Sequence, residues 1–240
     1  MSPLGRPRVH LREIGSTNER ARMLALAGAP HGTLVTASTQ TAGRGRQGRR
    51  WSAPANSSLL MSLILRSPTS LLPLIAAVAV CDVVGDDAQI KWPNDVVLPR
   101  SGPTRPLAKL AGILVEARPQ AGWAVLGIGV NVAVRLEDLP VELRAGASTL
   151  GYSPEEIEPL LERLLTTLAR RLAEPASVTL AAWRLRDALY GREIAWDAHD
   201  PTVGHGRAQG IDGMGRLIVE LAEGGRTTLD AGEVHLEPVG

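Results

Sequence analysis

Hydrophobic positions in the first third of the chain alternate between strand-like and helix-like spacing. β-Branched and apolar residues are concentrated at residues 33–39 and 58–66, and this enrichment predicts two strands. Residues 16–19 have the spacing of a capping box, so a helix should begin there and run to about Ala27. The run at residues 70–84 is rich in Leu and Ala, which predicts a buried helix.

Three short β-type runs follow, at residues 88–98, 110–117 and 123–132, and turn residues separate them. We expect these runs to be neighbouring strands of one sheet. Apolar residues then recur every three or four positions at residues 155–173 and 177–189, which is the spacing of an amphipathic helix. These two helices should close the first part of the chain.

The sequence changes in character after residue 190. Frequent glycines separate four short apolar runs, at residues 193–196, 207–211, 217–221 and 233–236. This pattern favours a small β-barrel. We therefore predict two domains, residues 1–189 and 190–240.

The composition is that of a folded protein with a sizeable core, since 44% of the 240 residues are hydrophobic. The 26 basic and 25 acidic residues nearly balance, which argues against a dedicated nucleic-acid binder. A single cysteine, Cys81, excludes an intramolecular disulfide and fits a reducing compartment. The longest apolar run is shorter than the roughly 18 to 20 residues of a membrane span, and no signal segment precedes it. We therefore expect a cytoplasmic protein without membrane contact.

Lysine is rare in this arginine-rich chain, which contains only Lys91 and Lys109. Arginine supplies every other basic side chain. Two lysines could persist by chance, but their retention could also reflect a task that arginine does not perform. The segments around these lysines decide between the two interpretations.

Residues 40–51 read QTAGRGRQGRRW, and their Gly and Arg content predicts an exposed loop. The segment contains the GxGxxG spacing of dinucleotide-binding turns. Its variable positions are arginines instead of the apolar residues of a helix, which argues against a Rossmann site. Glycines allow close backbone approach to a phosphate, and guanidinium groups match phosphate and carboxylate oxygens. The segment is therefore either an anion-binding loop or a solvated basic loop.

Three later segments combine residues that are poor choices for packing. KWPND, at residues 91–95, places a cation, an aromatic ring, a turn, an amide and a carboxylate together at a strand end. KLAGILVE, at residues 109–116, leads with a lysine into a strand in which Gly112 leaves room for a ligand. GIGVNV, at residues 127–132, combines glycines on one face with Asn131. Each has an ordinary structural explanation alone, but together they favour a binding site.

In this order, STNE, QTAGRGRQGRRW, KWPNDV, KLAGILVE and GIGVNV closely resemble the biotin protein ligases. These motifs cover residues 16–132, and the glycine-rich stretch at residues 191–238 looks like the C-terminal domain of the same family. The resemblance implies an α+β fold: a mixed central sheet flanked by helices, related to the lipoate ligases and to class II aminoacyl-tRNA synthetases. A small SH3-like β-barrel should follow it.

The resemblance also implies a reaction. Biotin would be activated with ATP to biotinyl-5′-adenylate with release of pyrophosphate, and biotin would then pass to a lysine of a biotin carboxyl carrier domain of acetyl-CoA carboxylase or a related carboxylase. Mg²⁺ should arrive with ATP, because the five histidines lack metal-binding spacing. The sequence leaves the ligands of this metal unknown. Only 15 residues precede Ser16, so we expect a ligase without a DNA-binding domain or repressor activity.

Site residues follow from motif position. The resemblance assigns biotin binding to Ser16, Thr17, Asn18, Gln40, Gly43, Arg44, Gly45, Arg46, Lys109 and Gly112. It assigns binding of ATP and the adenylate to Arg44, Arg46, Arg49, Trp51, Lys91, Asn94, Lys109 and Asn131, with Trp51 against the adenine. The catalytic residues would be Lys109, Arg46 and Asp95. The two cations would neutralise the repelling carboxylate and triphosphate, and Asp95 would orient the attacking lysine.

Three alternatives to the ligase explain parts of the sequence. A lipoate or octanoate ligase of the same fold would bind an apolar chain, and the polar residues Ser16, Thr17 and Gln40 argue against it. A nucleic-acid binder would use the arginines of residues 44–50 as a phosphate clamp, but this leaves residues 91–95 unexplained. A purely structural role is the weakest alternative, since so many Gly, Asn and Arg residues pack poorly.

Overall fold

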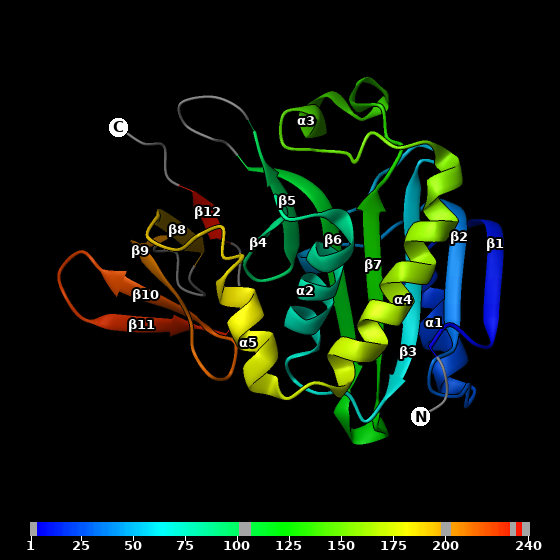
Figure 1. The fold of residues 1–240 in the computed structure, drawn as a ribbon, viewed down its shortest axis with the longest axis horizontal. Helices are drawn as coiled ribbons and strands as arrows, with labels where there is room; N and C mark the ends of the chain where they lie inside the picture. Colours follow the sequence, from blue (N-terminus) through cyan, green and yellow to red (C-terminus); the bar gives the residue numbers. More distant parts are fainter. Residues whose placement is uncertain (1–3, 101–106, 198–202, 231–233, 237–240) are drawn as a thin grey trace.

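A seven-stranded mixed sheet forms the larger part of the protein in the computed structural model, which describes residues 4–100, 107–197, 203–230 and 234–236 (Figure 1). From one edge to the other its strands are β1 (Arg8–Ile14), β2 (Leu34–Gln40), β3 (Ser58–Arg66), β7 (Trp123–Asn131), β6 (Leu107–Arg118), β5 (Asp95–Pro99) and β4 (Gln89–Lys91). The pair β1 and β2 is parallel, and all other neighbours are antiparallel.

Helices cover the two faces of this sheet unequally. Helix α1 (Thr17–Leu26) lies on one face, where its Ala21 and Ala25 pack against Ile64 of β3. Helices α2 (Leu72–Val84) and α4 (Ile157–Ala173) lie on the other face and bury Leu63 of β3 (Figure 1). Adjacent residues of a strand point to opposite faces, so Leu63 and Ile64 belong to different cores. The face with α1 is left partly open.

A second, five-stranded antiparallel sheet lies beside the first (Figure 1). Its strands, in spatial order, are β11 (Arg226–Leu229), β10 (Leu217–Leu221), β9 (Val203–Ile211), β8 (Glu193–Asp197) and β12 (Val234–Leu236). Helix α5 (Ala176–Arg184) packs against α2 just before this sheet begins. The mixed sheet, its flanking helices and the small β-domain confirm the predicted fold class, while the domain boundary near residue 190 stays a prediction.

The remaining regular elements are short. They are helix α3 (Val141–Arg144) and the 3₁₀ turns η1 (Arg46–Gly48), η2 (Pro119–Ala121), η3 (Leu136–Asp138) and η4 (Pro154–Glu156). Turn η1 lies within the segment that was predicted to be an irregular loop. Contacts of that segment with the sheet, described below, give it this local order.

The predicted strand at residues 88–98 and the predicted helix at residues 177–189 differ most from the structure. The run at residues 88–98 is a hairpin, β4 and β5, because residues 92–94 form its turn. The helix expected to reach residue 189 ends at Arg184. The chain beyond it pairs with β4 instead: Ile90 N donates to the oxygen of Arg186 at 2.7 Å, and Ala188 N donates to the oxygen of Ile90 at 3.0 Å. These strand hydrogen bonds compete with continued helix.

The N-terminus of α1 differs from the predicted capping box. Ser16 occupies the N-cap position, but its side chain makes no capping hydrogen bond. Glu19 pairs with Arg44 at 3.2 Å instead of reaching back to the cap. The helix was therefore predicted correctly, whereas the side-chain interactions at its start were not. Ser16 consequently keeps its hydroxyl for another partner.

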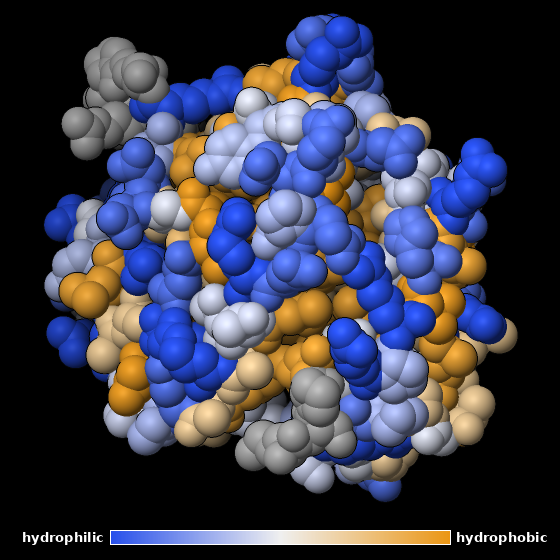
Figure 2. All heavy atoms as spheres, turned by 45° about the vertical axis from the view of Figure 1, so that its right-hand side comes forward, coloured by the Kyte–Doolittle hydropathy of each residue, from blue (hydrophilic) through white to orange (hydrophobic). Residues whose placement is uncertain are grey.

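The surface carries hydrophilic residues with smaller hydrophobic areas between them on the face drawn in Figure 2. Among the helices of the described residues, none is both long enough and apolar enough to span a bilayer. Cys81 is buried in α2, and burial raises the pKa of its thiol to about 12. This environment makes the cysteine a core residue instead of a nucleophile.

Candidate active site

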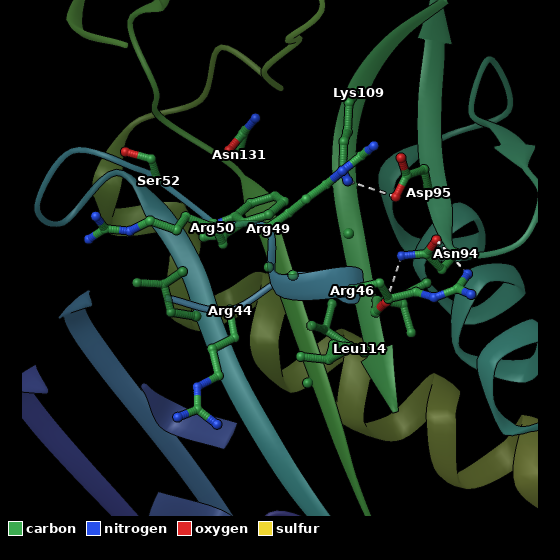
Figure 3. Close-up of a pocket in the computed structure, with 18 of the residues that line it drawn as sticks. Arg44, Arg46, Arg49, Arg50, Ser52, Asn94, Asp95, Lys109, Leu114 and Asn131 are labelled. Atoms are coloured by element: carbon green, nitrogen blue, oxygen red, sulfur yellow. Dashed lines mark hydrogen bonds and ion pairs between the residues drawn. The ribbon is translucent and has the colours of Figure 1, made fainter. Parts of the chain in front are cut away.

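A cavity of about 340 Å³ opens on the face of the large sheet that carries α1 (Figure 3). Strand register explains why separate motifs meet there. One row of cross-strand partners runs over five strands, and it consists of Leu60, Gly129, Gly112, Asp95 and Lys91. Side chains in one row point to the same face. Residues from KWPND, KLAGILVE and GIGVNV are therefore neighbours by strand pairing.

The paired glycines Gly112 and Gly129 form a flat floor under the Trp51 ring. A Cβ added at Gly129 would lie 2.7 Å from the ring, and one added at Gly112 would lie 2.9 Å from it. Gly127 serves a different side chain, since its Cβ would lie 2.1 Å from Asn18 Oδ1. Because Trp51 and Asn18 lie so close to the backbone of these strands, only glycine fits at the three positions.

A β-bulge turns Lys109 toward the cavity. Val96 pairs with Ala111 and Val97 pairs with Lys109, so Leu110 is an extra residue in β6. Leu110 and Ala111 both lie in the core on the other face of the sheet. The regular alternation of side chains between the two faces is therefore interrupted at Leu110. A bulge of this kind re-aims the next side chain. Lys109 therefore shares a face with Gly112.

Lys109 lies between a carboxylate and an aromatic ring. Its Nζ is 2.7 Å from Asp95 Oδ1 (Figure 3) and 5.8 Å from the centroid of the Trp51 ring. The Lys109 side chain remains 39% exposed, so the ammonium group faces the cavity while it is paired. An anion that enters the cavity could therefore replace Asp95 as the partner of the Lys109 ammonium group.

The Gly-Arg segment at residues 43–51 is held at both sides of the cavity. Arg46 Nη1 donates to Asn94 Oδ1 at 3.3 Å (Figure 3). On the α1 side, Arg44 pairs with Glu19. Burial lowers the pKa of Arg46, and the charge of Asp95 acts in the opposite direction. Arg46 stays cationic at neutral pH, because arginine does not lose its proton in proteins.

A polar end of the cavity is built by α1, β2 and β3. Thr17 N and Oγ1 donate to Gln40 Oε1 at 2.7 and 3.0 Å. Ser62 Oγ donates to Asn18 Oδ1 at 2.6 Å, and Asn18 Nδ2 donates to Glu116 Oε2 at 2.8 Å. These contacts fix the orientation of both amides. The network is preorganised to bind a small polar group.

Lys91 lies on β4, across the sheet from α1 and β2, and Asn131 ends the central strand β7. Burial lowers the pKa of Lys91, with the Asp95 charge opposing this shift and the Lys109 and Arg49 charges adding to it. Asn131 Nδ2 donates to the oxygen of Ser148 at 2.9 Å, so its amide also secures the chain that borders the cavity. From Lys109 to Lys91 the lining is cationic, with Arg46 and Arg49 also lining the cavity, and this side suits a polyanion.

All of the predicted site residues line the cavity except Gly43, where an added Cβ would lie 2.5 Å from the oxygen of Trp51. Their assigned roles stay predictions. Sequence reasoning missed lining residues inside the motifs, among them Trp92, Leu114, Gly127 and Gly129. It also missed residues outside them: Leu139, Glu142, Leu143, Gly146, Ala147 and Val234. These last lie in segments without a motif, so their sequence carried no signal.

No cluster of three or more His, Cys, Asp or Glu side chains suited to a metal ion is present in the described part of the chain. Oxygen atoms of a polyphosphate are suitable ligands for Mg²⁺.

Two family models match the sequence. The model of the biotin/lipoate A/B protein ligase family matches residues 11–132, and that of the biotin protein ligase C-terminal domain matches residues 191–236. The first range includes every predicted site residue.

Characterised relatives align over most of the chain. The biotin--[acetyl-CoA-carboxylase] ligase of Mycobacterium tuberculosis is 35% identical, with 93% of this chain and 87% of the relative covered. The ligase of the same name from Paracoccus denitrificans is 34% identical, with 93% and 98% covered. The bifunctional ligase/repressor BirA of Bacillus spizizenii is 33% identical, with 92% and 71% covered.

Solved structures agree with the fold. The biotin protein ligase of Aquifex aeolicus, in complex with biotin and ATP, has a TM-score of 0.77 at 24% identity, with 98% of this chain and 100% of the other covered. At this identity the likeness concerns the fold alone. Together with the family models and the relatives above 30% identity, it shows that the chain belongs to the biotin protein ligases of the biotin/lipoate A/B protein ligase family.

Proposed function

We propose that the protein is an ATP-dependent biotin protein ligase that forms biotinyl-5′-adenylate and transfers biotin to a lysine of a carboxylase carrier domain. The observation that carries this proposal is the position of Lys109. In the order of the strands, β6 with Lys109 lies between β2, which carries Gln40 of the polar end, and β4, which carries Lys91. A carboxylate bound at one end and a triphosphate bound at the other would meet at Lys109.

The relatives support the choice of substrates. Two of those above 30% identity are named biotin--[acetyl-CoA-carboxylase] ligases, which gives the proposed activity and the proposed carrier. The polar end of the cavity suits the ureido ring of biotin, since Thr17, Asn18 and Gln40 supply fixed donors and acceptors. Leu114 offers apolar surface for the rest of the molecule.

Charge neutralisation would drive the first step. The carboxylate of biotin attacks the α-phosphorus of ATP, and pyrophosphate leaves with the electron pair of the broken P–O bond. Both reactants are anions, so Lys109 and Arg46 would lower the barrier by binding the charge that accumulates between them. Asp95 would release Lys109 when the anions arrive, because it holds that ammonium group in their absence.

The second step is acyl transfer to an amine. A neutral lysine of the carrier attacks the carbonyl carbon of the mixed anhydride, AMP leaves, and the nitrogen loses a proton. Asp95 is placed to orient this amine once Lys109 has turned to the phosphate. Trp51, packed on its glycine floor, would cover the adenine ring.

Mg²⁺ would enter with ATP, where it reduces the negative charge of the phosphates. Asp95, the cross-strand partner of Lys91, and the adjacent Asn94 are oxygen-bearing side chains that line the cavity. Addition of a chelator to the complete reaction is expected to stop adenylation and to leave the protein folded.

The direct test is a mass measurement on a biotin carboxyl carrier domain incubated with the protein, biotin and MgATP. The carrier is expected to gain the mass of one biotinyl group, and omission of any one component should abolish the gain. Lipoate or octanoate in place of biotin is the matched control. Modification of the carrier by these acids but not by biotin would refute the proposed substrate.

We further propose that the protein does not act as a repressor or bind nucleic acid. A filter-binding titration with duplex DNA at increasing salt is expected to give only weak binding. Tight binding with a steep dependence on salt concentration would contradict this part of the proposal.

A further inference from the structure

The second sheet anchors one wall of the cavity from outside. The indole Nε1 of Trp92 donates a hydrogen bond to the backbone oxygen of Gly215 at 3.1 Å, across 123 residues of sequence. Trp92 is only 2% exposed. Its neighbours Lys91, Asn94 and Asp95 line the cavity. A single buried contact thus joins KWPND to the turn between β9 and β10.

That turn is held rigidly. Asp212 Oδ1 accepts hydrogen bonds from the backbone nitrogens of Met214 and Arg216, each at 2.9 Å, and Asp212 Oδ2 accepts one from Arg216 Nε at 2.7 Å. Gly215 has a φ of +82°, and an added Cβ would lie 2.6 Å from Leu74 of α2. The Gly215 oxygen is therefore presented to Trp92 at a fixed position.

Two further contacts join the same wall to the carboxy-terminal part of the chain. Strand β4 exchanges backbone hydrogen bonds with the segment that precedes β8, through Ile90, Arg186 and Ala188. Val234 of β12 lines the cavity directly. Strand β4, in which KWPND begins, is therefore also joined to the segment that leads into the second sheet.

The position of the KWPND turn determines how Arg46 and Lys109, the two proposed catalytic cations, are held. Asn94 Oδ1 accepts from Arg46, and Asn94 Nδ2 donates to the oxygen of Ile113 at 2.9 Å. Asp95 pairs with Lys109. A shift of the backbone at Trp92 would therefore move the partners of Arg46 and Lys109 together. At the polar end, Thr17 of α1 instead donates to Gln40 of β2.

We infer that Trp92 is a positioning residue through which the second sheet sets the place of Asn94 and Asp95 for the adenylation step. This inference rests on the proposed function, since adenylation is the step that brings the two anions together. Trp92 itself need not touch a reactant. Substitution of Trp92 should therefore change kcat and the KM for ATP, and should leave the KM for biotin unchanged.

The test compares two tryptophan substitutions. Trp92→Phe keeps a buried ring and removes the donor to Gly215. Trp183→Phe is the matched control, because Trp183 is fully buried in α5 and its indole nitrogen has no hydrogen-bond partner among the described residues. Biotin-dependent exchange of pyrophosphate into ATP is measured while ATP and biotin are varied in turn.

For Trp92→Phe we expect kcat/KM for ATP to fall about tenfold, within the range for leaving a buried acceptor unpaired. The KM for biotin should stay within about twofold. Trp183→Phe should leave both constants close to the wild-type values. Asp212→Ala loosens the turn without touching the cavity and should also lower kcat/KM for ATP. In the double variant with Trp92→Phe, it should lower this constant little further.

Equal behaviour of Trp92→Phe and Trp183→Phe, or an equal rise of both KM values, would overturn the inference. If Trp92→Phe does not fold, Asp212→Ala decides alone: a selective loss for ATP supports the inference, and unchanged constants overturn it. A wild-type protein without biotin-dependent exchange would instead refute the proposed function, so the two failures are distinguishable.

Discussion

At the scale of single residues, the cavity depends on cations held in place before any anion arrives. Lys109 is paired with Asp95 at 2.7 Å and remains 39% exposed. Lysine suits this place because a compact ammonium group on a flexible chain can turn from one anion to another. Arg46 is held more firmly, by burial and by Asn94.

Removal of the ammonium group should therefore abolish chemistry without unfolding the protein. Lys109→Ala is expected to reduce pyrophosphate release in the presence of biotin by about 10²- to 10³-fold. The exposed Arg12→Ala removes one positive charge elsewhere and is the matched control. Thermal unfolding of both variants checks the fold. A Lys109→Ala protein that releases pyrophosphate at nearly the wild-type rate would remove Lys109 from the mechanism.

Asp187 is a second informative residue, because burial raises its pKa from 3.8 to about 6. Its Oδ1 accepts from Leu189 N at 2.8 Å, whereas its buried Oδ2 has no partner among the described residues. The native state therefore binds this proton more tightly than the unfolded chain does. Stability is lost as pH rises from about 4 to 6, and the loss is complete above pH 6.

Asp187→Asn should accordingly stabilise the protein at neutral pH. The asparagine keeps the acceptor for Leu189 and carries no charge, so we expect the free energy of unfolding at pH 7.5 to rise by about 1 to 2 kcal/mol. Below about pH 4 the difference should disappear, because Asp187 is then protonated in both states. Urea unfolding at the two pH values measures it, and a pH-independent difference would contradict the assignment.

At the scale of elements, the cavity floor is a property of paired strands. Gly112 and Gly129 are cross-strand partners, and Trp51 lies on both. Gly129→Ala should push the ring outward, since the added Cβ would lie 2.7 Å from it. We expect loss of most adenylation activity and a red-shifted fluorescence of Trp51, which would become exposed to water. Gly15→Ala is the control, because its added Cβ meets nothing within 4 Å. Normal activity of Gly129→Ala would show that the packing of Trp51 is dispensable.

Strong apolar patterns made most elements predictable from the sequence. The runs at residues 33–39 and 58–66 became β2 and β3 almost unchanged, since both are buried. Strand β1, with the sequence RVHLREI, was missed because charged residues occupy positions on both of its faces. An exposed edge strand can carry such charges. Strand β11, with the sequence RTTL, is too polar to give a signal.

The motif segments located the cavity but not its geometry. Their side chains meet because strand register aligns them, and register depends on pairing between distant parts of the chain. The bulge at Leu110, which turns Lys109 to the cavity, has no local signature. The apparent capping box at Ser16 also misled, because its side chains have other partners in the folded protein. Tertiary contacts thus decided what local patterns left open.

At the scale of the whole molecule, one hydrophobic core joins the two sheets. A single cluster includes Leu63 of β3, Leu74 of α2, and Ile211 and Leu217 of the second sheet. A shared core favours cooperative unfolding, because neither sheet can lose its packing without exposing part of the other. The contact of Trp92 with Gly215 crosses the same interface.

Damage to the second sheet should therefore destabilise the first. Leu217 is fully buried, and Leu217→Ala is expected to cost about 2 to 5 kcal/mol. Urea unfolding followed by hydrogen exchange should show β3 and β10 losing protection at the same, lowered midpoint. Met214→Ala is the control, since Met214 is 70% exposed on the neighbouring turn. If β3 kept its wild-type midpoint while β10 lost protection, the two sheets would be independent units, and the second sheet could not hold the KWPND turn in place.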